Sequence, residues 1–264
     1  MDKIMQTAVN AAHTAGRLIH EAAQDLSSLN IEQKTLHDYV SDVDRNSESL
    51  INQIIKEVFP DHMIKGEEHG VQSGTSNEHC WVIDPLDGTT NFLRGIPHYA
   101  VSIALLTQGE PSHAVVFDPI KNEMFTAIEG QGAKLNDMPI SSSCIESARG
   151  GLYATGVPFN GKPLEKLSSF TNTMHGVLDI QTSGIRRLGS AALDLAYVAA
   201  GRYDGYWESN LQVWDIAAGV LLVKEAGGLV SDLRGGDEYL DSGDVLAASA
   251  GAYGELLEVC QKEY

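Results

Sequence analysis

One stretch of the chain reads Trp81-Val-Ile-Asp-Pro-Leu-Asp-Gly-Thr-Thr-Asn-Phe92. Its beginning, Trp81–Asp84, is a short apolar run that ends on a carboxylate, which predicts a buried strand with an acidic side chain at its end. A second carboxylate, Asp87, follows three positions later, and Pro85 between them restricts the turn. The stretch therefore predicts two carboxylates held rigidly at the end of a strand.

The residues that follow these carboxylates favour the binding of an anion. Gly88-Thr89-Thr90 offers backbone N–H groups with little steric cover and two hydroxyl groups, which suit a phosphate. Carboxylates beside a phosphate call for a cation between them, and Mg²⁺ binds through a few carboxylates, water and substrate phosphate. The alternative is purely structural, since the same residues would form an Asx-type turn in which Asp87 caps a helix.

Two other segments carry carboxylates that could join this pair. Gly66-Glu67-Glu68-His69-Gly70 predicts a flexible loop before the Asp84 strand, where glutamates are commonly just solvated. Asp215 stands between Trp214 and the apolar run Ile216–Val223, at the expected start of a helix. There it would act either as a simple N-cap or as a ligand beside the positive end of the helix.

Outward from these segments, the chain mixes helical and strand patterns. Apolar residues from Ile4 to Ala22 recur at helical spacing, and Ser41 with Asp44 three positions later predicts a second helix, which Pro60 ends. The remaining patterns predict a loop over residues 66–79, strands over Tyr99–Leu106, His113–Phe117 and Glu123–Ala127, a turn at Gln108-Gly109, and helices over Ser190–Ala200 and from Asp215 to Gly227. We expect a layered α/β or α+β fold in one domain that spans residues 1–264.

The composition restricts the partners and the compartment. The 264 residues include 36 Asp+Glu against 18 Lys+Arg, a formal net charge of −18, which argues against nucleic acid or an anionic membrane surface as partner because both are polyanions. The three cysteines, Cys80, Cys144 and Cys260, form neither a zinc spacing nor a disulfide framework. The N-terminal segment lacks the continuous apolar stretch of a signal peptide. These observations predict a soluble, cytoplasmic protein.

Two segments, taken at full length, resemble a known family. WVIDPLDGTTNFLRG (residues 81–95) and WDIAAGVLLVKEAGG (residues 214–228), with Gly-Glu-Glu upstream, resemble the signature motifs of the inositol monophosphatase family. Ile185–Leu193 and Gly205–Glu208 resemble it too, so that the similarity covers nearly the whole chain, most closely to bacterial inositol-1-monophosphatases. The resemblance implies the alternating αβαβα sandwich that this family shares with fructose bisphosphatase.

The resemblance also implies which residues bind metal. Glu67 would bind an activating Mg²⁺, Asp84 would bridge two metals, and the backbone carbonyl of Leu86 would complete the first site. Asp87 and Asp215 would hold the second metal. The two or three Mg²⁺ ions so implied would lower the pKa of a bound water, polarise the phosphoryl oxygens and neutralise the leaving alkoxide.

Further residues are implied to act on the water and the substrate. Gly88 and Thr89 would supply phosphate-binding N–H groups, and the Thr89 hydroxyl, paired with Asp44, would orient and deprotonate the attacking water. Ala191 and Glu208 would contact the inositol ring. The implied catalytic set is thus Asp44, Glu67 and Thr89, and the implied substrate-binding set is Asp87, Gly88, Thr89, Ala191, Glu208 and Asp215.

Family members are typically dimeric and lithium-sensitive, and we expect a homodimer here. Lys34 aligns with a lysine of a mobile loop near the active site. His69 departs from the family pattern, since many members carry Ser at that position. We expect this difference to affect the conformation of the loop or the charge near the metal.

Three hypotheses follow. The first is a Mg²⁺-dependent phosphatase of inositol monophosphate or a similar small sugar phosphate, with a phosphate monoester as its small-molecule partner. The second keeps the chemistry and changes the substrate to 3′-phosphoadenosine 5′-phosphate or another nucleotide phosphate. The third is a regulatory binding protein that retains the fold and docks to another protein. No GxSxG elbow occurs in the sequence, which removes the commonest alternative hydrolase.

Overall fold

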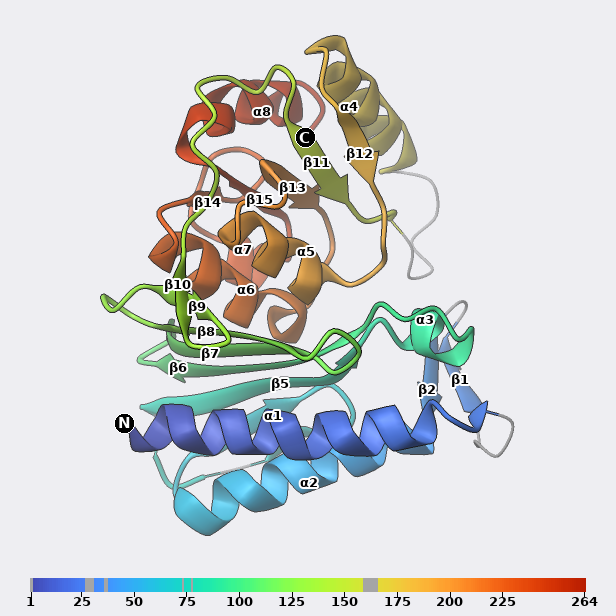
Figure 1. The fold of residues 1–264 in the computed structure, drawn as a ribbon, viewed down its shortest axis with the longest axis vertical. Helices are drawn as coiled ribbons and strands as arrows, with labels where there is room; N and C mark the ends of the chain where they lie inside the picture. The colour runs from blue at the N-terminus through green and yellow to red at the C-terminus, as the bar shows by residue number, and fades with distance from the viewer. Residues whose placement is uncertain (1, 27–30, 36–37, 73, 77, 159–165) are drawn as a thin grey trace.

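Helices and sheets alternate along the long axis of the molecule (Figure 1). The computed structural model describes residues 2–26, 31–35, 38–72, 74–76, 78–158 and 166–264, with the backbone alone for residues 31–35 and 38–40. In the described part of the chain the layers are a helix pair, a large sheet, a second helix pair, a small sheet and a third helix pair. This is the αβαβα sandwich that the resemblance implied.

The first layer consists of α1 (Lys3–Ala22) and α2 (Asp42–Val58), both predicted from their apolar spacing. Their apolar faces pack against each other and against the large sheet. Ser41 caps α2, because its hydroxyl accepts from the N–H of Val43 while the side chain of Asp44 accepts from the N–H of Ser41. The helix start predicted from Ser41 and Asp44 is therefore confirmed, and the two residues form a capping box.

The large sheet has eight described strands in the order β10-β9-β8-β7-β6-β5-β3-β4. The predicted strands of the middle of the chain all lie in it. Its strands are β3 (Met63–Gly66), β4 (Gly70–Gln72), β5 (His79–Asp87), β6 (Ala100–Thr107), β7 (Glu110–Asp118), β8 (Glu123–Ile128), β9 (Ala133–Leu135) and β10 (Met138–Ile140). Neighbours run antiparallel except β3 and β5, which are parallel. Gln108 and Gly109 make the predicted turn between β6 and β7 with φ of 54° and 93°, as a tight hairpin requires.

An irregularity in β5 positions the first two predicted ligands. Asp84 pairs with Ser102 of β6 and Asp87 pairs with Ala100, so three steps along β5 match two steps along β6. One extra residue is thereby inserted into β5, which is a β-bulge. Pro85 lies inside it, at one of the few places in a sheet where a residue without an N–H is tolerated.

The middle layer consists of α5 (Ala191–Ala199) and α6 (Val213–Glu225), which lie between the two sheets (Figure 1). The helix predicted over Ser190–Ala200 is thus present, with Ser190 as its N-cap. The apolar run Ile216–Val223 is buried on all sides, as expected of a helix covered by sheets on both faces. The predicted start of this helix was wrong by two residues, because α6 begins at Val213.

The small sheet has the order β12-β11-β13-β15-β14 and is covered on its outer side by α4 and α8. Most of these elements were not predicted. They are β11 (Leu152–Thr155), β12 (Gly184–Arg186), β13 (Gly205–Glu208), β14 (Leu229–Ser231), β15 (Val245–Ala248), α4 (Leu167–Asp179) and α8 (Ala250–Gln261), with the short α7 (Tyr239–Ser242) nearby. Strands of three or four residues are too short to show a period in the sequence.

Two short elements lie near the end of β5 that carries Asp87: the hairpin of β1 (Ile31–Thr35) and β2 (Asp38–Ser41), and α3 (Thr89–Leu93) (Figure 1). Among the described residues, no helix combines the length and apolar character that crossing a bilayer requires.

Candidate active site

The four side chains predicted as metal ligands lie within electrostatic range of one another. Asp84, at the bulge of β5, is 2% exposed, and its burial raises its pKa well above the ordinary value. The negative charges of Glu67, Asp87 and Asp215 raise it further. Because these carboxylates come from β5, from the turn after β3 and from the start of α6, the fold brings together three segments that are far apart in the sequence.

This donor set fits a hard cation. Burying several carboxylates together is costly unless a positive charge compensates them, and oxygen ligands are those that Mg²⁺ prefers. Within the described residues, no three His, Cys, Asp or Glu side chains are already arranged around one point as metal ligands. A closed cage is not required for Mg²⁺, which binds to one or two carboxylates and keeps several waters.

Asp87 spans the gap between the large sheet and the middle helices. Its Oδ2 atom accepts hydrogen bonds from the Ser190 hydroxyl and the Ala192 N–H, each at 2.7 Å. Burial nevertheless raises its pKa to about 6. The structural alternative, in which Asp87 caps the helix that follows it, is wrong, because Gly88 is the N-cap of α3 and no side chain caps that helix. Asp87 instead accepts from the first turn of α5, whose N-cap is Ser190.

Asp215 is likewise bound on one side. It is the third residue of α6, and its Oδ2 atom accepts from the N–H of Gln212 at 2.7 Å. The interpretation of Asp215 as an N-cap is therefore wrong, since Gln212 holds that position. Burial and the charge of Asp87 both raise the pKa of Asp215 well above the ordinary value, which places its carboxylate beside the metal-binding candidates.

The predicted pair of Thr89 and Asp44 is in direct contact. The Thr89 hydroxyl lies 3.0 Å from Asp44 Oδ1 and 3.0 Å from the carbonyl oxygen of Leu86. Asp44 is 1% exposed, and its Oδ2 accepts from the hydroxyl and the N–H of Ser41 at 2.6 and 2.8 Å. Burial raises the pKa of Asp44, against these hydrogen bonds. Thr89 thereby joins α2 to the Leu86 carbonyl, which was predicted as a metal ligand.

Gly88 lies in the left-handed region with φ of 98°, which glycine adopts without strain. A Cβ atom there would stand 3.0 Å from the carbonyl oxygen of His98 and 3.1 Å from the Cβ of Tyr99. Both the backbone angle and the close approach of the neighbouring chain therefore require glycine. This conformation turns the chain from β5 directly into α3.

The two residues predicted to contact the substrate ring lie at the ends of neighbouring elements. Ala191 is the first residue of α5 and is 7% exposed. Glu208 ends β13, and its Oε2 accepts from the hydroxyl of Tyr206 at 2.5 Å. Burial raises the pKa of Glu208 to about 7, and the charge of Asp87 contributes to the rise. Glu208 therefore lies close enough to Asp87 for the two charges to interact.

Sequence reasoning missed Glu48, which is fully buried on α2. Its carboxylate accepts from the N–H groups of Glu68 and His69, and His69 Nδ1 lies 3.0 Å from Glu48 Oε1. The predicted flexible loop is thus tied to a helix, and its end forms β4. One signal could have found this residue: Glu48 follows Asp44 by four positions and shares its helix face. Lys34 has no described side chain, so its predicted role lies outside the described residues.

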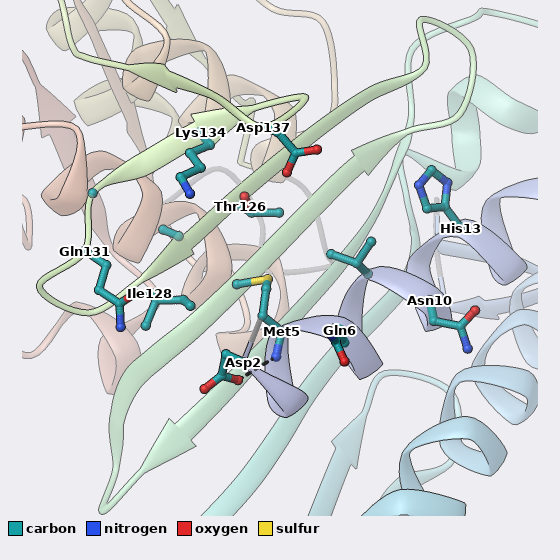
Figure 2. A pocket seen from close by; sticks show the side chains of 13 residues that line it. Asp2, Met5, Gln6, Asn10, His13, Thr126, Ile128, Gln131, Lys134 and Asp137 are labelled. Atoms are coloured by element: carbon teal, nitrogen blue, oxygen red, sulfur yellow. Dashed lines mark hydrogen bonds between the residues drawn. The ribbon is translucent and has the colours of Figure 1, made fainter.

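A cavity of about 540 Å³ lies elsewhere, between the N-terminal half of α1 and the hairpin of β8 and β9 (Figure 2). The close-up shows Met5 and Asn10 on the helix side, and Thr126 and Lys134 on the sheet side. None of the residues that line it is a predicted site residue. The chemistry of the candidate site therefore rests on the carboxylates around Asp84 and not on this cavity.

Comparison with known proteins identifies this arrangement. The family model for the inositol monophosphatase family matches residues 1–263. The chain belongs to the inositol monophosphatase family. Nus factor SuhB of Pseudomonas aeruginosa is 46% identical over 263 residues, which cover 99% of this chain and 97% of that protein.

Solved structures agree with the family fold. Extragenic suppressor protein suhB from Bartonella henselae has a TM-score of 0.95 at 40% identity, and the match covers 100% of both chains. Inositol monophosphatase from Anabaena has a TM-score of 0.86 at 34% identity, covering 99% of this chain and 96% of that one. Family membership, the layered fold and the general assignment as a phosphatase of this family are thereby confirmed.

Proposed function

We propose that the chain is a Mg²⁺-dependent phosphomonoesterase that hydrolyses inositol monophosphate or a similar small polyol phosphate. The observation that carries this proposal is the group of mutually repelling carboxylates around the buried Asp84, beside the contact between Thr89 and Asp44. Family membership supports phosphatase chemistry with divalent metal ions. The similarity to the inositol monophosphatase of Anabaena supports the substrate class.

In this proposal Thr89 and Asp44 act on the attacking water. The Thr89 hydroxyl donates toward Asp44, so its oxygen is left to accept a hydrogen bond from the water. Asp44 then receives the proton through Thr89, and a buried carboxylate with a raised pKa is the better base for this task. No covalent nucleophile is needed.

The metal ligands would be Glu67, Asp84, Asp87, Asp215 and the Leu86 carbonyl. Bound Mg²⁺ would lower the pKa of the attacking water, so that Asp44 can take its proton, and would neutralise charge on the phosphoryl oxygens and the leaving alkoxide. The N–H groups of Gly88 and Thr89 would hold the phosphate oxygens. Glu208 and Ala191, beyond Asp87, would face the hydroxyl groups of the polyol.

A panel of phosphate monoesters, assayed with and without Mg²⁺, tests the proposal. We expect phosphate release that requires Mg²⁺, is inhibited by lithium, and falls by at least about 1000-fold in Asp215→Asn, because an active site that loses a metal ligand loses most of its activation of water. Glu225→Gln, at the other end of α6, is the matched control and should keep the wild-type rate. Undiminished turnover in Asp215→Asn would overturn the proposal.

The same panel of phosphate monoesters tests the alternative substrate, 3′-phosphoadenosine 5′-phosphate or another nucleotide phosphate. Competition between the two substrate classes in one assay decides between them. The chemistry proposed for Asp44, Thr89 and the metal ligands is common to both. We expect the polyol phosphate to have the higher kcat/KM.

A second role is supported by the names of the relatives. Proteins called Nus factor SuhB are 43–46% identical to this chain over nearly its whole length, so we propose a transcription-related binding role in addition to catalysis. The charge of −18 favours docking to a protein component over direct contact with nucleic acid. A pull-down with the transcription machinery that survives Asp215→Asn would show that this role is separate from the metal site.

We further propose a cytoplasmic homodimer. Two exposed apolar side chains, Ile96 and Leu188, support a second copy of the chain as partner. Asn91 links the two residues, because its backbone carbonyl accepts from the N–H of Ile96 and its side-chain amide donates to the carbonyl of Leu188. Burial of such side chains is a common driving force for self-association. Sedimentation of the purified chain measures its mass in solution.

A further inference from the structure

Glu48 is an acidic side chain that the proposed chemistry does not use. It lies on α2, one helical turn after Asp44, and its side chain is 0% exposed. A buried carboxylate needs compensating donors. It accepts hydrogen bonds from the turn between β3 and β4: the N–H of Glu68 lies 2.7 Å from Oε2, and the N–H of His69 lies 3.0 Å from Oε1.

These contacts enclose Glu67 on both sides. The two N–H donors follow Glu67 in the chain, while Gly66 precedes it and approaches Glu48 closely. A Cβ atom on Gly66 would stand 2.2 Å from Glu48 Oε1, so no larger residue fits there while Glu48 keeps its place. The N–H of Glu67 itself donates to the carbonyl of Ile83 in β5 at 3.1 Å. The backbone around Glu67 is therefore fixed from α2 and from β5.

We propose that Glu48 is a positioning residue, which holds the turn so that the Glu67 carboxylate faces Asp84 at the metal site. The identity of the metal as Mg²⁺ rests on the proposed function. Glu48 and Asp44 share one face of α2, so a single rigid helix would fix both the base that acts on the water and the backbone that presents a metal ligand.

Binding of Mn²⁺, followed by electron paramagnetic resonance, tests this without any turnover. In Glu48→Gln the side chain keeps its size, but an amide has one acceptor oxygen and its NH₂ group would face a backbone N–H. We expect the Kd for Mn²⁺ to rise by about 10-fold or more, the range seen when groups that orient metal ligands are removed. Glu57→Gln, an exposed position on the same helix, should leave the Kd unchanged.

A double-mutant cycle keeps the proposal falsifiable if Glu48→Gln is less stable. Gly66→Ala should weaken Mn²⁺ binding strongly in the wild-type background, because the new methyl group collides with Glu48. In a Glu48→Ala background the collision is absent, and adding Gly66→Ala should change the Kd by less than about twofold. Equal effects in both backgrounds would overturn the proposed contact.

His69→Ser separates the side-chain contact from the backbone contact. The His69 N–H still reaches Glu48 in this variant, so we expect a Kd for Mn²⁺ within about twofold of wild type. Wild-type Mn²⁺ affinity in Glu48→Gln, or a loss of thermal stability with no change of Kd in the folded protein, would refute a positioning role. Weaker Mn²⁺ binding in Glu48→Gln, together with no phosphatase activity in the wild type, would leave the positioning role standing and refute the proposed function alone.

Discussion

Asp84 lowers the stability of the metal-free folded protein, because its carboxylate is buried next to the other carboxylates of the candidate site. It accepts a hydrogen bond from the N–H of Leu86 at 2.9 Å, while three other carboxylates raise its pKa. A carboxyl group whose pKa is raised on folding favours the folded state at pH values below its ordinary pKa. That contribution is lost as the pH rises through the folded-state value, because the ionised group must then stay buried. For Asp87 that folded-state value is about 6.

In metal-free protein we therefore expect thermal stability to fall as the pH rises from 5 to 7. Asp84→Asn removes one of the repelling charges, so it should raise the Tm of the metal-free protein at pH 7 and flatten this pH dependence, while Mg²⁺-dependent phosphate release is lost. Calorimetry in the presence of a chelator measures both effects. An Asp84→Asn variant that is less stable than wild type at pH 7, with the pH slope intact, would contradict the proposed repulsion.

At the scale of the element, the N-terminus of α2 combines a structural and a chemical task. The Ser41 hydroxyl caps the helix through Val43 and also donates to Asp44, which in turn accepts from Thr89. The capping box therefore sets the position of the proposed base as well as the start of the helix. Few changes at this end of α2 would affect stability without affecting the Asp44 carboxylate.

Ser41→Ala should lower the free energy of unfolding by about 1 kcal/mol, the usual cost of losing a cap. It should also lower kcat several-fold with KM nearly unchanged, because Asp44 loses a hydrogen bond while the phosphate contacts remain. Chemical denaturation and steady-state kinetics measure the two effects. Ser49→Ala, which removes an exposed hydroxyl on the same helix, is the control. A stability loss with unchanged kcat would show that the cap does not orient Asp44.

At the scale of the molecule, α5 and α6 hold the two sheets together. The approach of the two helices depends on Gly219, where a Cβ atom would stand 2.5 Å from the Cβ of Leu195. Since both helices contact both sheets, a strain between them is transmitted to the whole layered stack. We propose that residues 1–264 unfold as one cooperative domain.

Gly219→Ala is expected to reduce the free energy of unfolding by about 1–3 kcal/mol through overpacking, and to do so in a single transition for both sheets. Gly254→Ala, in α8 where nothing lies within 4 Å of the added atom, should instead stabilise by about 0.5–1 kcal/mol. Hydrogen exchange resolved along the chain measures whether the sheets open together. Two separate transitions would contradict the single domain.

The sequence predicted those elements that are determined by residues close together in the chain. The apolar spacing of α1, the capping box of Ser41 and the turn at Gln108-Gly109 depend on neighbours in the chain, and all three were predicted. The motif around Asp84 and its resemblance to a family supplied the layered fold and the candidate ligands.

The rest depends on contacts between distant segments. Whether β11 and β13 form a sheet of their own could not be predicted, because strands of four residues carry no period and their partners are set by packing. The same holds for the site. That Asp87 accepts a hydrogen bond from Ser190, 103 residues beyond it, and that Glu48 accepts one from the turn after Glu67 are properties of the assembled layers.

The bulge in β5 has an arithmetic consequence. Side chains on a regular strand alternate between its faces, so residues separated by an odd number of steps point to opposite sides of the sheet. Asp84 and Asp87 are three steps apart, yet their partners Ser102 and Ala100 on β6 are two steps apart and share a face. The residue inserted by the bulge therefore places Asp84 and Asp87 on the same face of the sheet, although they are three steps apart. Deleting Pro85 or Leu86 would restore a regular strand in which the two carboxylates stay on one face of the sheet, one position closer together. Removing the bulge without changing the length of the strand would instead place the two carboxylates on opposite faces of the sheet.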